Sequence, residues 1–81
     1  MSDSTVKKPV TVYKKDNCIQ CTMTMKEMDK LGIKYETVNM SENEAEREKV
    51  KGMGYMTAPV VFVDEGNHWG GFRLDKIATL A

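Results

Sequence analysis

The two cysteines of the chain stand two residues apart, in the sequence Cys18-Ile19-Gln20-Cys21, and this spacing constrains the fold more than any other feature. A disulfide across so short a loop removes little freedom from the unfolded chain, so it cannot hold distant parts of a fold together. The core must therefore come from packed helices and strands, and 81 residues allow one domain, residues 1–81. In a reducing compartment such a cysteine pair is typically catalytic or metal-binding.

The overall charge balance excludes several classes of partner. Twelve basic and twelve acidic side chains cancel, so no long-range field favours nucleic acid or an anionic membrane. The polar start, Met1–Pro9, is not followed by an apolar run of the length of a secretory signal, and no stretch approaches the roughly twenty apolar residues of a membrane span. We therefore expect a cytoplasmic monomer with neither a nucleic-acid nor a membrane partner.

The segments around the cysteines predict a strand followed by a helix. Residues 10–13 are β-branched and aromatic, and the polar residues 14–17 that follow indicate a turn. From Cys18 to Leu31, apolar residues recur at helical spacing, and Gly32 supplies a stop. The cysteine pair is thus expected in the first turn of this helix.

The middle of the chain predicts a second strand and a second helix. Residues 33–39 alternate in polarity, which is typical of a strand with one buried face. Ser41 and Glu44 have the spacing of a capping box, which predicts a helix from there to about Lys51. Acidic and basic residues three apart on this helix indicate a solvated face more than a binding site; the pairs are Glu44 with Arg47, Glu46 with Lys49, and Glu48 with Lys51.

The last third of the chain predicts two strands and a short helix. Gly52 and Gly54 end the charged helix, and the apolar run 60–63 after Pro59 is typical of a central strand covered on both faces. Residues 64–67 have turn composition and lead to a brief strand at 68–69, with a helix from there to Ala81. The order βαβαββα predicts an α/β fold whose four-stranded mixed sheet has parallel first strands and an antiparallel last pair, flanked by three helices.

The position of the cysteines at a helix start predicts reactivity. Unpaired backbone N–H groups and the helix dipole stabilise a thiolate there, so we expect the pKa of Cys18 to lie below that of a free cysteine. Lys14 and Lys15 would strengthen this effect and Asp16 would weaken it. Cys21, one turn deeper, is expected to be the buried thiol that resolves a mixed disulfide, and Cys18 the nucleophile.

A different class of protein remains open on this evidence. Two cysteines with this spacing also form half of a zinc site, and His68 is the one other strong ligand in the sequence. A zinc-bound or purely binding module without turnover is therefore the alternative to a redox protein. The redox interpretation needs no metal or other cofactor.

Two motifs now carry a resemblance to a known family. The first strand, the Cys-x-x-Cys helix start and the Ala58-Pro59 step before an apolar strand resemble the thioredoxin fold, closest to glutaredoxin-like proteins. Together with residues 69–75, Trp-Gly-Gly-Phe-Arg-Leu-Asp, residues 18–21 look like those of NrdH-redoxins. The chain departs from that pattern at Gly70, where serine is usual, and at Leu74, where proline is usual.

The resemblance implies a thiol-disulfide oxidoreductase that passes electrons from thioredoxin reductase to the large subunit of a class Ib ribonucleotide reductase. It implies independence from glutathione, because Phe72 and Arg73 stand where glutaredoxins carry an acidic pair. A glutathione-dependent glutaredoxin is the alternative within the same chemistry.

The same resemblance implies roles for residues around the cysteines. Pro59 would follow a cis peptide bond, and the backbone of residue 58 would be free to pair with an extended substrate. Ile19 and Gln20 would tune the redox potential and access. The residues expected to bind substrate or partner are Thr57, Ala58, Pro59, Trp69, Phe72 and Arg73. For Trp69 and Arg73 the alternatives are core packing and surface charge pairing, and an exposed Met23 is either part of a docking surface or a stray surface residue.

Overall fold

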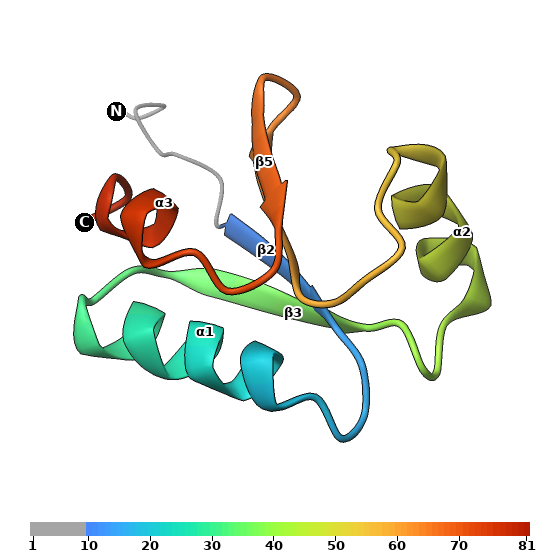
Figure 1. The fold of residues 1–81 in the computed structure, drawn as a ribbon, viewed down its shortest axis with the longest axis horizontal. Helices are drawn as coiled ribbons and strands as arrows, with labels where there is room; N and C mark the ends of the chain where they lie inside the picture. The colour runs from blue at the N-terminus through green and yellow to red at the C-terminus, as the bar shows by residue number, and fades with distance from the viewer. Residues whose placement is uncertain (1–9) are drawn as a thin grey trace, which may run out of the picture.

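The computed structural model describes residues 10–81, which fold in the order strand, helix, strand, helix, strand, strand, helix (Figure 1). The strands are β2 (Val10–Lys14), β3 (Tyr35–Asn39), β4 (Val60–Asp64) and β5 (Asn67–Gly70). The helices are α1 (Ile19–Lys30), α2 (Glu44–Gly52) and α3 (Leu74–Ala78). The predicted α/β order is confirmed, whereas the expectation for Met1–Pro9 lies outside the described residues.

The sheet has the predicted mixture of parallel and antiparallel pairs. Its strand order is β3-β2-β4-β5, with β2 parallel to β3 and the β2/β4 and β4/β5 pairs antiparallel. Val12 lies opposite Thr37 on one side and Val61 on the other, and Val61 in turn lies opposite Trp69. The fully buried valines therefore fall on the two interior strands, as the apolar run of β4 predicted.

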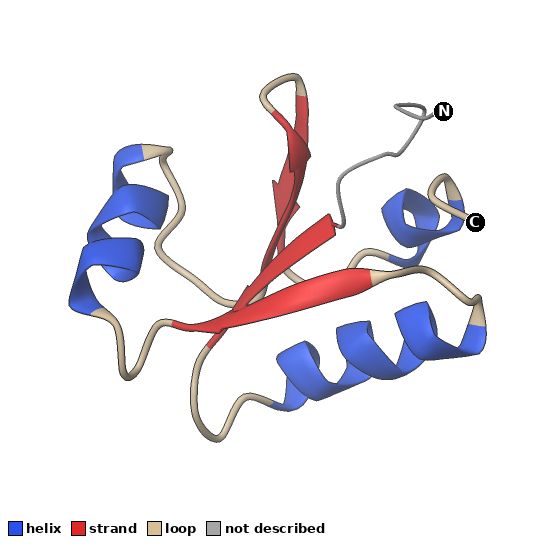
Figure 2. Ribbon diagram, turned by 180° about the vertical axis from the view of Figure 1, so that it is seen from behind, coloured by secondary structure: helices blue, strands red, loops and turns tan. Residues whose placement is uncertain are grey.

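Helices cover both faces of this sheet. Helices α1 and α3 lie against one face and α2 against the other (Figure 2). Met28 of α1 and Ile77 of α3 are fully buried in the first core, and each such side chain stabilises the fold by about 1.5–3 kcal/mol. Val50 of α2 packs into the second core with Tyr13. Within residues 10–81, no helix is long and apolar enough to cross a membrane.

The end of α1 explains why β3 begins later than predicted. Gly32 has φ = 72°, and its N–H donates to the Asp29 carbonyl, while Ile33 N–H donates to the Met28 carbonyl at 2.9 Å. This pair of bonds is a Schellman motif, in which a left-handed residue satisfies the last carbonyls of a helix. Ile33 therefore closes the helix, and the strand starts at Tyr35 rather than at residue 33.

The start of α2 corrects the predicted capping box. Asn43, not Ser41, caps the helix, because its Oδ1 accepts from the backbone N–H of Glu46 at 3.3 Å. Ser41 Oγ instead accepts from the backbone N–H of Asp16 at 2.9 Å. Ser41 thus ties the turn before the cysteines to the loop after β3.

The end of α2 repeats the Schellman motif. Gly54 has φ = 98° and donates to the Lys51 carbonyl, while Tyr55 N–H donates to the Val50 carbonyl at 3.3 Å. Tyr55 and Val50 also pack in the same core. The segment that leads to Pro59 is therefore fixed at its start by the helix that precedes it.

Two further predictions need correction in detail. The pairs Glu44–Arg47 and Glu46–Lys49 form at 3.7 and 4.0 Å, but the predicted pair of Glu48 with Lys51 is not among the ion pairs within residues 10–81. Helix α3 ends at Ala78 rather than Ala81, since the last residues bond to carbonyls only three positions back. Such bonds tighten a helix end.

Candidate active site

The cysteine pair occupies the predicted position at the start of α1. Asn17 precedes it with φ = 58°, a left-handed conformation that asparagine tolerates, and this turns the chain from β2 into the helix. Cys18 is the N-cap, and the backbone N–H of Cys21 lies 3.1 Å from its Sγ. The two residues form a disulfide with their Cα atoms 5.2 Å apart.

Burial distinguishes the two sulfurs. Cys21 is 1% exposed and packs with Tyr13 and Ala58, whereas Cys18 is half-buried. The predicted difference in depth is thus confirmed. Attack by an external thiol or on an external disulfide requires access to the sulfur, and of the two only Cys18 offers it.

A shallow hollow lies beside Cys18. It is lined by Lys14, Lys15 and Asp16, among others, so all three charged residues that the sequence placed near the thiol do border it. The Asp16 carboxylate accepts from Asn39 Nδ2 at 3.0 Å. This bond holds the Asp16 carboxylate against β3.

The segment 57–59 contacts the cysteine pair. The Ala58–Pro59 peptide bond is cis, Ala58 and Pro59 are buried, and Ala58 packs in the same core as Cys21. Thr57 is exposed. Within residues 10–81 the Ala58 N–H has no backbone acceptor, which leaves it available to an extended chain laid beside it.

The double-glycine segment, Gly70-Gly71, also packs against the residues around the cysteines. Gly71 N–H donates to the Pro59 carbonyl at 2.7 Å, and Gly71 has φ = 86°, which favours glycine. A Cβ on Gly71 would lie 4.0 Å from Gln20 Oε1. Gln20, Pro59 and Gly71 therefore meet, so three segments distant in sequence assemble around the cysteines.

The sequence left two roles open for Trp69, partner binding and core packing, and the structure places it in the core. It is 4% exposed and lies in the first core with Met28 and Ile77. Its Nε1 is buried and without a hydrogen-bond partner within residues 10–81. A side chain this buried contributes to the site by supporting β5.

Phe72 and Arg73 differ from Trp69 and from each other. Phe72 is half-buried against the first core. Arg73 is exposed and donates to both Asp75 carboxylate oxygens, at 3.1 and 2.9 Å. The hydrogen bond from Arg73 lowers the pKa of Asp75, and the same bond raises the pKa of Arg73. Arg73 thus makes the surface charge pair that the sequence offered as its alternative role.

Exposed apolar side chains occur around the cysteines. Ile19 is 77% exposed immediately after Cys18, and Met23, predicted to be exposed, is 43% exposed. Met56, immediately before Thr57, is 79% exposed. Met56 was not among the site residues predicted from the sequence, although its place directly before the Thr57-Ala58-Pro59 segment was a usable signal.

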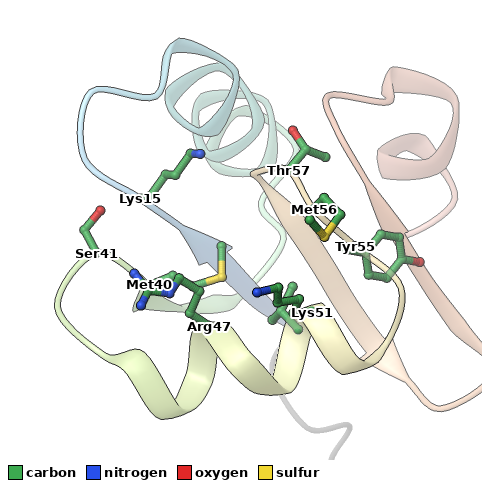
Figure 3. A pocket seen from close by; sticks show the side chains of 9 residues that line it. Lys15, Met40, Ser41, Arg47, Lys51, Tyr55, Met56 and Thr57 are labelled. Atoms are coloured by element: carbon green, nitrogen blue, oxygen red, sulfur yellow. The ribbon is translucent and has the colours of Figure 1, made fainter.

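A pocket that the sequence did not predict lies next to this surface. It measures about 290 Å³ and lies between α2 and the segment 55–57 (Figure 3). Lys15, Arg47 and Lys51 contribute its cationic groups. In the sequence, the charged residues spaced three apart along α2 indicated a face exposed to solvent. That pattern does not show which of the charged side chains point toward the pocket.

A tyrosine–histidine pair fixes one wall of the pocket. Tyr55 Oη and His68 Nδ1 are hydrogen-bonded at 2.6 Å, and the His68 ring stacks on Phe62 with 5.8 Å between centroids. His68 was the one further strong ligand candidate for a zinc site beside the two cysteines, and here its Nδ1 is bonded to Tyr55 instead. Within residues 10–81, no three metal-binding side chains cluster.

The fold and the cysteine pair together define a thiol-disulfide oxidoreductase with a thioredoxin-like fold. The Glutaredoxin family profile matches residues 10–69. The glutaredoxin-like protein NrdH of Lactococcus lactis subsp. lactis is 40% identical over 72 residues, which cover 89% of this chain and 99% of that protein. NrdH of Escherichia coli K12 is 31% identical over 71 residues, covering 88% and 86%.

Solved structures agree with this assignment. The Escherichia coli NrdH-redoxin, described as a glutaredoxin-like protein with a thioredoxin-like activity profile, superposes with a TM-score of 0.86 at 30% identity over 91% of this chain and 96% of that one. Glutaredoxin Grx-1 of Archaeoglobus fulgidus shares the fold, with a TM-score of 0.72 at 22% identity over 88% and 83%. The chain therefore belongs to the glutaredoxin family, as an NrdH-like redox protein with the pair Cys18–Cys21.

Proposed function

We propose that the chain accepts electrons from thioredoxin reductase and delivers them to the large subunit of a class Ib ribonucleotide reductase in the cytoplasm. The observation that carries the redox part is the half-buried Cys18 at the start of α1, joined by a disulfide to the buried Cys21. The similarity to NrdH proteins supports the choice of acceptor.

In the reduced protein, the Cys18 thiolate attacks one sulfur of the acceptor disulfide. A mixed disulfide forms, and the other acceptor sulfur leaves as a thiolate. Cys21 then loses its proton and attacks Cys18 Sγ, which releases the second acceptor thiolate. Two electrons have passed to the acceptor, its two thiolates take up protons, and the chain is left with the Cys18–Cys21 disulfide seen in the structure.

The backbone N–H groups at the start of α1 support the first step. The Cys21 N–H points at Cys18 Sγ from 3.1 Å, and the positive end of the helix dipole lies at the same place. Both interactions favour the thiolate over the thiol. An extended acceptor segment would lie against residue 58, with its disulfide at Cys18.

Glutathione is the second candidate electron source. The cationic side chains of the pocket beside α2 favour it, because glutathione carries two carboxylates. The Phe72-Arg73 step after Gly71 argues against it, since no acidic pair is present there to hold an amino group. We therefore place thioredoxin reductase first.

The test follows NADPH oxidation with a disulfide substrate and the purified chain. One reaction contains thioredoxin reductase, and the other contains glutathione with glutathione reductase. We expect turnover with thioredoxin reductase and background rates with glutathione. Turnover only with glutathione would make the chain a glutathione-dependent glutaredoxin.

A further inference from the structure

The pocket between α2 and the segment 55–57 has an apolar floor and a cationic rim. Met40 is 5% exposed and Val50 is 2% exposed, and both line the floor. Figure 3 shows Arg47 and Lys51 projecting from α2 and Lys15 on the opposite side of the space, with residues 55–57 at its end. A volume of about 290 Å³ is at the lower limit for small-molecule sites, and it suits one or two amino-acid side chains.

The charge of the rim is local and largely unpaired. Among residues 10–81, no acidic side chain lines the pocket. Within residues 10–81, Lys15 and Lys51 have no ion-pair partner, and the Arg47–Glu44 pair is long, at 3.7 Å, with both side chains more than half exposed. An exposed pair of this kind contributes little. In a chain with zero net charge, three cations around one hollow are therefore a local recognition feature.

The pocket is continuous with the redox site. Lys15 lines both this pocket and the hollow beside Cys18. Thr57 lines the pocket and is followed directly by Ala58, whose N–H is free of backbone acceptors within residues 10–81. A chain laid along residue 58 therefore passes from Cys18 to the pocket without leaving the surface.

We propose that this pocket binds an acidic, extended segment of the protein whose disulfide Cys18 reduces. One apolar side chain of that segment covers Met40 and Val50, and neighbouring carboxylates pair with Lys15, Arg47 and Lys51. The inference rests on the proposed function, because it names the chemistry of the acceptor for the same cysteine pair. Glutathione has carboxylates but no apolar side chain for the floor, so it matches only half of the pocket.

The test uses blocked peptides that carry a single cysteine as a mixed disulfide with 2-thiopyridone, a neutral leaving group. In one peptide, glutamate and leucine residues flank the cysteine; in its match, glutamine replaces each glutamate. The reduced chain in excess releases thiopyridone and free peptide thiol as Cys18–Cys21 forms, so absorbance reports one turnover. We expect the acidic peptide to react about five- to tenfold faster at low salt, and the difference to shrink at high salt.

Variants assign this preference to the pocket. Arg47→Gln combined with Lys51→Gln is expected to lose most of the difference between the two peptides. The matched control, Lys26→Gln with Lys76→Gln, removes two exposed charges that line neither this pocket nor the hollow beside Cys18, and it should keep the difference. If the pocket double variant does not fold, Lys15→Gln serves in its place.

Three results would overturn the inference. They are equal rates for the two peptides with the wild-type chain, a preference that survives in the pocket variant, and a faster reaction with the matching glutathione mixed disulfide than with the acidic peptide. Reduction of a neutral disulfide such as hydroxyethyl disulfide separates the two proposals. Its failure would remove the proposed function itself, whereas success without acidic preference would remove only the pocket's role.

Discussion

Substitution of Gly70 by alanine should destabilise the chain through one side chain, Tyr55. A Cβ at position 70 would lie 3.0 Å from Tyr55 Cδ1 and 3.3 Å from Cε1. Both distances are shorter than ordinary carbon contacts, and the ring cannot retreat freely because its hydroxyl is bonded to His68 at 2.6 Å. Tyr55 therefore packs in space that Gly70 leaves open.

The expected change in the free energy of unfolding combines two destabilising effects and one stabilising effect. Overpacking costs about 1–3 kcal/mol, and a weakened Tyr55–His68 hydrogen bond adds up to about 1 kcal/mol. Alanine in a strand regains about 0.5–1 kcal/mol relative to glycine. We therefore expect Gly70→Ala to lower the free energy of unfolding by about 1–2 kcal/mol, and to be neutral or mildly stabilising when Tyr55 is also alanine. The coupling between the two positions is then about 2 kcal/mol.

Urea unfolding of the oxidised protein, followed by circular dichroism, measures all four members of this cycle. Gly66→Ala is the matched control on the same hairpin, because its Cβ would meet only Asp64 Oδ1, at an ordinary 3.6 Å. If Gly70→Ala lowers the free energy of unfolding by the same amount with and without the Tyr55 ring, then contact with Tyr55 is not the cause of the loss.

Three further predictions concern the cysteines and Tyr35. Cys18→Ser should abolish thiol-disulfide exchange, whereas Cys21→Ser should accumulate a mixed disulfide that intact-mass spectrometry detects. Wild-type turnover of the Cys18 variant would contradict the assignment of Cys18 as the nucleophile. Thiolate absorbance of the reduced protein should give Cys18 a pKa below the ordinary value of about 8.5, since the Cys21 N–H faces its sulfur, and an ordinary value would remove this cause. Burial and the hydrogen bond to Asp29 raise the pKa of Tyr35 above 10.0, so its contribution to stability is present below about pH 10 and is lost as pH rises through the folded-state pKa. Tyr35→Phe should make the alkaline fall in stability shallower, and an unchanged fall would contradict this.

The sequence was sufficient for the fold where pattern and local chemistry agree. β-Branched runs, the glycine stops and the cysteine pair predicted every strand and helix of residues 10–81 in order. The errors occur where several residues compete for one role. Ser41 and Asn43 are both good caps, and only the tertiary bond from Asp16 to Ser41 decides between them.

The site divides in the same way. The depth of Cys18 and Cys21 followed from helical spacing, because one turn of a helix separates them. The direction in which Arg47 and Lys51 point did not follow from the sequence, because the face of α2 that lies toward residues 55–57 depends on how the helix packs on the sheet. The Tyr55–His68 bond likewise joins residues 13 positions apart that periodicity does not relate.

Reconstitution of the complete electron relay tests the proposed function in one assay. NADPH, thioredoxin reductase, the chain and a class Ib ribonucleotide reductase are combined without any small-molecule thiol. We expect one deoxyribonucleotide formed per NADPH oxidised, a rate that saturates with the concentration of the chain, and no product with Cys18→Ser. Absence of product with the wild-type chain, while dithiothreitol sustains the same reductase preparation, would mean that the chain does not carry electrons from thioredoxin reductase to this ribonucleotide reductase.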